Sequence, residues 1–332
     1  MNILIVRVSS LGDVVHNMPM LADLRRHVPD AQIDWVVEES YASLVRLNGA
    51  VRKVIPFALR RWRKSLGSPG TRAELHAFRK ALRATAYDLV FDTQGLIKTG
   101  LVMRMARLAP GGRRIGLANA TEGSGYEGLS RLFHTASVPV GLRTHAVQRA
   151  REVAAAALGY TVEGPADFNL GAPDLQPGWL PSQPYAVFFH GTARAGKQWP
   201  EAHWIALGKQ LTGQGLALLL PWGSDAEHEA ARRIAAGIPG ARVLPKLPLM
   251  EAVTLAQRAA LAVGVDTGLT HIAAAFERPT VELYCDSPRW KTEGNWSPRI
   301  INLGDAGAPP DVADVAAAAL ALMGRPATRS AC

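Results

Sequence analysis

An aspartate, a threonine and a glycine follow an apolar stretch late in the chain, and together they could bind a phosphate group. Residues 261–265 predict a buried strand and residues 269–276 carry a helical pattern, so Asp266, Thr267 and Gly268 lie in the turn between them. The free N–H groups and the positive dipole end of a helix N-terminus suit a phosphate. Asp266 and Thr267 could equally well cap the helix and bind nothing. Taken alone, the two interpretations are about even.

A second candidate, Asp13, follows the first predicted strand, where Gly12 permits a tight turn into a helix. A carboxylate at this place could act as a general base that takes a proton from an acceptor hydroxyl. By itself, a helix-capping aspartate is the better-supported interpretation, by about two to one. No GxGxxG sequence follows this strand, which argues against a dinucleotide-binding domain.

Two loops in the second half of the chain carry further candidates. Thr192 offers a hydroxyl, and Lys197 places a cation just ahead of a helix, in reach of an anion at the sheet edge. The stretch lacks the GxxxxGK[ST] form of a P-loop, and an ordinary glycine-containing loop is the alternative. Glu227 begins another helix, where it could accept hydrogen bonds from a sugar hydroxyl. A partnership with the helix dipole is the favoured interpretation for Glu227 taken alone.

Four cations surround one tryptophan in the segment Arg60-Arg61-Trp62-Arg63-Lys64. Guanidinium groups prefer planar anions, so the segment could bind an anionic acceptor or an anionic membrane surface. The chain as a whole has 37 basic and 28 acidic residues, a net charge of +9. Such a balance favours an anionic partner of some kind. No nucleic-acid-binding motif accompanies it, and we expect no nucleic-acid partner.

Composition narrows the class of protein. With 332 residues, of which 48% are hydrophobic and 20% charged, the chain is typical of a globular protein of two domains. Its two cysteines, Cys285 and Cys332, form no metal-binding pattern, no DxD sequence occurs, and we expect no metal cofactor. The first residues lack the order of a signal peptide, and no apolar run approaches a membrane span. We therefore expect a cytoplasmic protein with peripheral membrane contact at most.

Strands and helices alternate along the chain, which predicts the α/β class with parallel sheets. A proline-rich stretch over residues 165–184 is the best domain boundary, giving an N-terminal domain over 1–170 and a C-terminal domain over 171–310. Residues 109–140 are predicted to be rich in loops. Two doubly wound domains facing each other would place a cleft at the carboxyl ends of both sheets, where ligands bind. The predicted strands are residues 3–8, 33–37, 51–55, 89–92, 186–189, 216–220, 242–244, 261–265 and 281–284, and the predicted helices include 14–26, 71–84, 96–106, 145–158, 202–211, 226–236, 249–259, 269–276 and 312–323.

These motifs, taken in their order, resemble the ADP-heptose glycosyltransferase family of lipopolysaccharide biosynthesis. The resemblance runs over nearly the whole chain and is carried by residues 6–16, 34–39, 60–64, 92–96, 220–223 and 265–271. It implies the GT-B architecture of two Rossmann-like domains, in which the N-terminal domain takes the acceptor and the C-terminal domain the nucleotide sugar. It also implies that the last helix, within residues 311–332, crosses back to the N-terminal domain and leaves a flexible tail.

The resemblance implies a role for each candidate. Asp13 would be the catalytic base, with Lys197 stabilising the leaving group, and Glu227 would bind the adenosine ribose. Leu247 would lie beside the adenine in place of a methionine, and Ala193 stands where relatives often have a second threonine. The diphosphate and heptose would be held by Thr192, Lys197, Asp266, Thr267, Gly268 and His271, and the acceptor by Arg60, Arg61, Arg63 and Lys64.

The implied reaction is an inverting transfer that needs no metal. The donor would be ADP-L-glycero-β-D-manno-heptose, and the acceptor the first Kdo of Kdo2-lipid A at the inner face of the cytoplasmic membrane. The basic segment and the Asp266-Thr267-Gly268 form favour this reaction over that of heptosyltransferase II, the alternative within the family. A two-domain nucleotide-sugar epimerase, a non-catalytic binding protein and an NAD oxidoreductase are rivals outside it; the missing glycine fingerprint disfavours the last.

Overall fold

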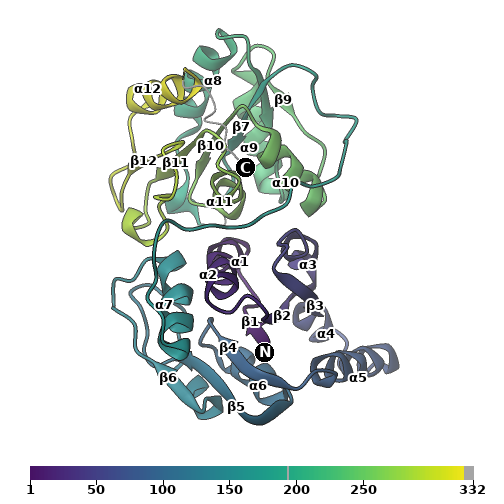
Figure 1. Ribbon diagram of the computed structural model, residues 1–332. Coiled ribbons are helices and arrows are strands. Elements are labelled where there is room, and N and C mark those ends of the chain that lie inside the picture. Colours follow the sequence, from purple (N-terminus) through teal and green to yellow (C-terminus); the bar gives the residue numbers. More distant parts are fainter. Residues whose placement is uncertain (193, 325–332) are drawn as a thin grey trace. The chain divides into compact units, whose positions relative to one another are not determined.

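The computed structural model describes residues 1–192 and 194–324, and the chain divides into two compact units, 1–171 and 172–332 (Figure 1). This division lies one residue from the predicted boundary. Ala193 and the tail from residue 325, which includes Cys332, lie outside the described residues. In the described part of the chain, no helix has the length and apolar composition to cross a membrane.

The N-terminal unit is built on a parallel sheet that has six strands in the described residues, in the order β3-β2-β1-β4-β5-β6. This is the strand order of a doubly wound Rossmann domain, so the predicted α/β class is confirmed. The strands are β1 (Asn2–Val6), β2 (Gln32–Glu38), β3 (Val51–Phe57), β4 (Tyr87–Asp92), β5 (Leu108–Leu117) and β6 (Ala136–Val138). The connecting helices are α1 (Leu11–His16), α2 (Pro19–His27), α3 (Ala42–Val45), α4 (Leu59–Trp62), α5 (Pro69–Arg83), α6 (Ile97–Met105) and α7 (Ala146–Leu158), with short 3₁₀ turns η1 (Glu39–Tyr41) and η2 (Gly128–Phe133).

The C-terminal unit repeats this topology with the order β12-β11-β10-β7-β8-β9 in the described residues. Its central strands are buried on both faces because helices cover the sheet on each side. The strands are β7 (Tyr185–Phe189), β8 (Ala217–Leu220), β9 (Arg242–Val243), β10 (Leu261–Val265), β11 (Thr280–Tyr284) and β12 (Ile300–Gly304). The helices are α8 (Glu201–Thr212), α9 (Asp225–Ala236), α10 (Leu249–Arg258), α11 (Gly268–Ala275) and α12 (Val312–Met323), with 3₁₀ turns η3 (Ala195–Lys197) and η4 (Arg289–Lys291).

Two predictions about elements were wrong, and one strand was missed. The stretch 109–140 contains β5 and β6, which apolar periodicity could not indicate because β5 carries Gly111, Gly112, Arg113 and Arg114. Strand β12, which pairs with β11, was not predicted at all. The helix predicted over residues 14–26 is two helices, since Pro19 begins α2 and removes a backbone donor there.

The predicted return of the last helix to the N-terminal domain is also wrong. Helix α12 packs against α8 and strands β10 to β12 of the C-terminal sheet (Figure 1). Val315, Ala319 and Leu322 lie in the same buried cluster as Trp199 and Leu283. The physical reason is that this apolar helix face fits the outer strands of its own unit, including the unpredicted β12.

A buried ion pair fastens two helices of the N-terminal unit. Arg151 on α7 donates to both oxygens of Asp23 on α2, at 2.7 and 3.0 Å, and the two side chains are 1% and 4% exposed. Bidentate geometry and two further carbonyl acceptors offset the desolvation of the guanidinium. This pair holds α7 against α2, and α7 carries Arg149 toward the end of β1.

Candidate functional site

The carboxyl end of β10 and the N-terminus of α11 form the centre of the C-terminal site. Asp266 follows β10 directly, Thr267 is the N-cap of α11, and Gly268 is the first helical residue. Strands β7 and β10 are neighbours in the sheet although they are far apart in sequence. The strand that follows β7 in the chain, β8, lies on one side of this pair, and the strand that follows β10, β11, lies on the other side. Such a switch in strand order leaves a crevice at the carboxyl ends, with unpaired N–H groups of the helix beside it.

Asp266 joins several side chains brought from separate elements. Its Oδ2 accepts from Lys197 Nζ at 2.5 Å and from Ser287 Oγ at 2.7 Å, while its Oδ1 lies 3.0 Å from His271 Nε2. The Lys197 and Asp266 side chains are 18% and 9% exposed, so water screens this pair only weakly. The structure therefore brings together five of the predicted donor-site residues at one edge of the sheet: Lys197, Asp266, Thr267, Gly268 and His271.

The charges of this cluster are set by its neighbours. Burial raises the pKa of Asp266, but hydrogen bonds and charge from His271 and Lys197 outweigh it and hold the pKa well below its usual range. Burial lowers the pKa of His271, yet the nearby Glu282 and Asp266 carboxylates raise it overall to about 10. These shifts favour an anionic Asp266 and a cationic His271 at neutral pH.

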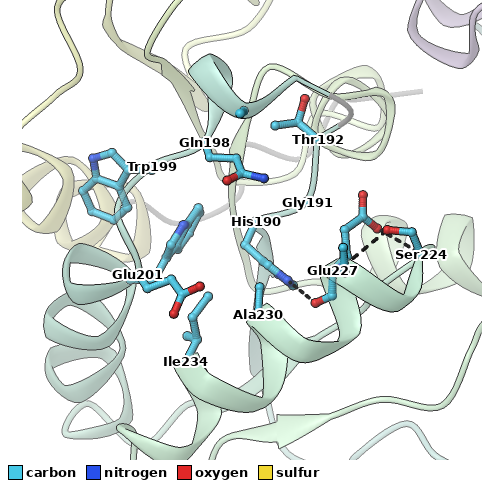
Figure 2. Close-up of a pocket in the computed structure, with 13 residues that line it drawn as sticks. His190, Gly191, Thr192, Gln198, Trp199, Glu201, Ser224, Glu227, Ala230 and Ile234 are labelled. Atoms are coloured by element: carbon cyan, nitrogen blue, oxygen red, sulfur yellow. Dashed lines mark hydrogen bonds between the residues drawn. The ribbon is translucent and has the colours of Figure 1, made fainter.

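A pocket of about 450 Å³ adjoins the loop after β7 and the start of α9 (Figure 2). Thr192 and Glu227 both line it, and Figure 2 shows their side chains near its rim. Glu227 Oε2 accepts from the backbone N–H groups of Gly223 at 2.7 Å and Ser224 at 3.2 Å, so it caps α9. Gly191 lies so close that an added Cβ would be 2.6 Å from Glu227 Cδ. The glycine is therefore required for Glu227 to lie over this loop.

Leu247 lies half-buried in the loop between β9 and α10. Nearby, the Trp222 indole donates to the carbonyl of Leu244 at 2.7 Å and stacks on His228 with ring centroids 4.2 Å apart. Lys246 Nζ lies 5.7 Å from the centre of the Trp222 ring. These contacts anchor the loop that carries Leu247.

Asp13 lies in the N-terminal unit, in the first turn of α1 beyond the carboxyl end of β1. Its Oδ2 accepts from the Ser10 N–H at 3.0 Å and the Ser10 hydroxyl at 2.8 Å, which closes the first turn of α1. Its Oδ1 lies 2.6 Å from the Arg7 guanidinium and 3.9 Å from that of Arg149. The N-cap of α1 is Ser10 rather than Asp13, and Asp13 completes a capping box from the third helical position. The two arginines go beyond what such a cap requires.

The arginines determine the charge of Asp13. Burial raises the pKa of this carboxyl, but Arg7, the two Ser10 hydrogen bonds and Arg149 hold it well below its usual range. Burial and the neighbouring Arg7 lower the pKa of Arg149 to about 10. The Arg7 side chain is 5% exposed and that of Asp13 is 36% exposed. Asp13 therefore remains ionised at neutral pH with one edge open to solvent.

The basic segment does not behave as a single surface. All four cations are exposed, but Arg61 is paired: it donates to both oxygens of Glu39 and to Glu74. Trp62 is buried at 3% exposure and donates to Glu74 at 2.7 Å. Arg61 and Trp62 thus hold the segment in place, and the other three cations face solvent.

Sequence reasoning missed several residues that complete these clusters. Arg7 lies in the stretch 6–16 that carries the resemblance, but it was given no role. Arg149 at Asp13, and Ser287 and Glu282 around Asp266 and His271, carried no motif of their own. Only Glu282 left a signal, since a charged residue inside the apolar strand β11 indicates a buried partner. Within residues 1–192 and 194–324, no group of three or more His, Cys, Asp or Glu residues is arranged to hold a metal ion.

Comparisons with known proteins identify the family of the chain. Residues 75–317 match glycosyltransferase family 9 (heptosyltransferase). The chain is 41% identical over 285 residues to lipopolysaccharide heptosyltransferase 1 of Pseudomonas aeruginosa, which covers 86% of this chain and 78% of that one. The solved structure of E. coli heptosyltransferase WaaC with ADP has a TM-score of 0.81 at 35% identity, covering 97% of this chain and 98% of that one. By contrast, lipopolysaccharide heptosyltransferase 2 of E. coli is 24% identical, covering 91% of this chain and 88% of that one.

Proposed function

The chain belongs to glycosyltransferase family 9, the heptosyltransferases, and from this premise we propose how its residues act on donor and acceptor. It is a glycosyltransferase of lipopolysaccharide inner-core biosynthesis, with heptosyltransferase 1 as its counterpart. The proposed reaction moves L-glycero-D-manno-heptose from ADP-heptose to the first Kdo of Kdo2-lipid A. The observation that carries the proposal is the Lys197–Asp266–His271 cluster at the N-terminus of α11.

The donor would lie on the carboxyl edge of the C-terminal sheet. The N–H groups at Thr267 and Gly268 would receive the diphosphate, which suits the positive end of α11. Lys197 would place its ammonium against the same group, and Thr192 would donate its hydroxyl. Glu227 has a second carboxylate oxygen, Oε1, that can accept from the ribose while Oε2 caps α9. Leu247 would pack against the adenine.

Asp13 would act as the base of an inverting transfer. Its carboxylate would take the proton of a Kdo hydroxyl while that oxygen bonds to the anomeric carbon of heptose, and ADP leaves from the opposite face. A low pKa is compatible with this role if the proton moves late, when the attacking oxygen already carries positive charge. Lys197 and the α11 amides would stabilise the developing charge of ADP, so we propose that no metal is required.

The three exposed cations Arg60, Arg63 and Lys64 would bind the anionic groups of the acceptor. Arg61 is engaged by Glu39 and Glu74, and we assign it to the support of the segment. Arginine is suited to carboxylate and phosphate through paired hydrogen bonds.

Exposed leucines support peripheral contact of the N-terminal unit with an anionic membrane. Leu129 and Leu132 are 62% and 79% exposed on η2, and residues three apart share one face of a 3₁₀ turn. Leu101 is 50% exposed on α6, which packs closely on η2. The same two elements expose Arg104 and Arg131. Apolar side chains beside cations are the combination that inserts at an anionic lipid surface.

A two-part assay tests the proposed reaction. Heating the protein with ADP, GDP and UDP in turn should show stabilisation by ADP alone, because a ligand that binds only the folded state stabilises it, and a tighter ligand does so more. Incubation with ADP-heptose and a Kdo acceptor should give a heptosylated product of inverted anomeric configuration. Conversion of the donor without any acceptor would instead indicate an epimerase.

Sedimentation with anionic and neutral vesicles tests the membrane proposal, and Leu132→Ser should reduce retention on the anionic vesicles.

A further inference from the structure

A buried carboxylate lies behind the Asp266 cluster and has no part in the reaction described above. Glu282 is the third residue of β11, and its side chain is 0% exposed. Its Oε1 lies 3.1 Å from His271 Nδ1, and its Oε2 accepts from the Tyr284 hydroxyl and the Gly294 N–H, both at 2.9 Å. An ionised carboxylate persists in such surroundings only when it is paired and hydrogen-bonded.

Charges of alternating sign run from the sheet edge into the interior through Lys197, Asp266, His271 and Glu282. A carboxylate oxygen faces each nitrogen of the His271 ring, at 3.0 Å and 3.1 Å. A carboxylate can only accept hydrogen bonds, so both contacts are satisfied when both ring nitrogens carry a proton. Other polar groups also contact the line: Ser287 and Thr292 donate to Asp266, and Tyr284 and the Gly294 N–H donate to Glu282.

We propose that Glu282 is a positioning residue of the donor site, which keeps the His271 ring doubly protonated and thereby fixes the Asp266 carboxylate that holds Lys197. The inference rests on the proposed function, because Lys197 is taken to stabilise departing ADP. If the His271 ring lost its second proton it would become neutral, and of these two cations only Lys197 would still balance the negative charge of Asp266. The positive potential at the diphosphate would fall, and the leaving group would be less well stabilised.

The substitution Glu282→Gln separates this role from simple packing. A glutamine carbonyl can accept from Tyr284 and Gly294 as the carboxylate does, so the buried donors keep an acceptor. Its NH₂ group would donate to His271 Nδ1, which selects the neutral ring with its single proton on Nε2. The substitution therefore preserves shape and removes the second proton. Glu282→Asp retains the charge, and Glu229→Gln removes one exposed negative charge from α9 as a matched control.

The protonation of His271 is read directly by NMR of the imidazole, assigned by comparison with His271→Gln. In the wild-type protein the ring should remain doubly protonated across pH 6 to about 8. In Glu282→Gln it should titrate within that range, as an ordinary histidine does, and Glu229→Gln should match the wild type. Titration of wild-type His271 near neutral pH overturns the proposal, and this measurement needs no variant that could fail to fold.

The pH dependence of heptose transfer completes the test. For Glu282→Gln, the pH profile of kcat should show a new ionisation, and kcat at pH 8 should be roughly tenfold lower than kcat at pH 6. This loss of kcat is smaller than the loss expected on removing a hydrogen-bond donor that touches the reacting group. The wild type and Glu282→Asp should lack this ionisation, and the acceptor KM should not change. A uniform loss at every pH would mean a structural role and overturn the proposal. Absence of transfer by the wild type would overturn the proposed function instead, while the NMR result would stand separately.

Discussion

Replacement of Asp13 by asparagine separates the chemical role of this residue from its structural one. The asparagine carbonyl can still accept from the Ser10 N–H, so the first turn of α1 keeps its cap. The side chain can no longer take a proton, and Arg7 and Arg149 lose their countercharge. Two effects of different size follow, one on the rate and one on stability.

The loss of the base should dominate. A positioned general base contributes about 10²–10⁴-fold, so we expect kcat to fall by roughly 10³-fold. Removing one partner of a fully buried pair costs about 3–5 kcal/mol. Because Asp13 is 36% exposed, solvent screens its charge, and we expect a loss of only about 1–2 kcal/mol in unfolding free energy. Donor binding should not change, since the proposed donor groups belong to the other unit.

The stability difference should depend on pH in a defined direction. The folded-state pKa of Asp13 is depressed, so its contribution to stability is present above the unfolded pKa, near 4, and is lost as the pH falls through the folded value. The wild type should therefore exceed Asp13→Asn in stability by a constant amount between pH 6 and 8, and the gap should narrow below about pH 4.

Three measurements check this reasoning, with Asp30→Asn, an exposed aspartate of the same unit, as the control. Steady-state transfer gives kcat, calorimetry gives the ADP affinity, and urea unfolding gives the stability. If Asp13→Asn keeps more than about a tenth of the wild-type kcat, general-base catalysis by this residue is refuted. If ADP affinity falls in parallel with kcat, Asp13 also affects donor binding, which contradicts the assignment of the donor groups to the C-terminal unit.

Four further outcomes are expected. Lys197→Ala should lower kcat by about 10²-fold and also weaken ADP binding; an unchanged kcat at saturating donor would limit Lys197 to ground-state binding. Gly191→Ala should displace Glu227 and weaken ADP binding by about tenfold in calorimetry, and an unaltered affinity would remove Glu227 from the ribose site. Arg60→Ala should raise the acceptor KM in steady-state assays with stability preserved within about 0.5 kcal/mol, and an unchanged KM would count against the acceptor surface. Transfer should continue in EDTA, and strong inhibition would contradict a metal-free reaction.

Local sequence determined the elements whose patterns are regular. Apolar runs predicted most strands, because a parallel sheet covered on both faces needs continuous hydrophobic residues. The turn residues Asp266, Thr267 and Gly268 predicted a helix N-terminus, which α11 has. Where apolar periodicity was absent, as in the glycine- and arginine-rich β5, prediction failed, because pairing with neighbouring strands rather than local preference makes that segment a strand.

Only the tertiary structure decided what each polar side chain contacts. Lys197 and Asp266 are 69 positions apart in sequence, and they meet because β7 and β10 are neighbours in the sheet. The same holds for Glu282, which reaches His271 from β11, and for Arg61, which is tied to Glu39 and Glu74 although it reads as one of four equal cations. Residue type and order indicate which groups can do chemistry. Their charge and availability depend on burial and on partners distant in sequence, and those are set by the order of strands in the folded sheet.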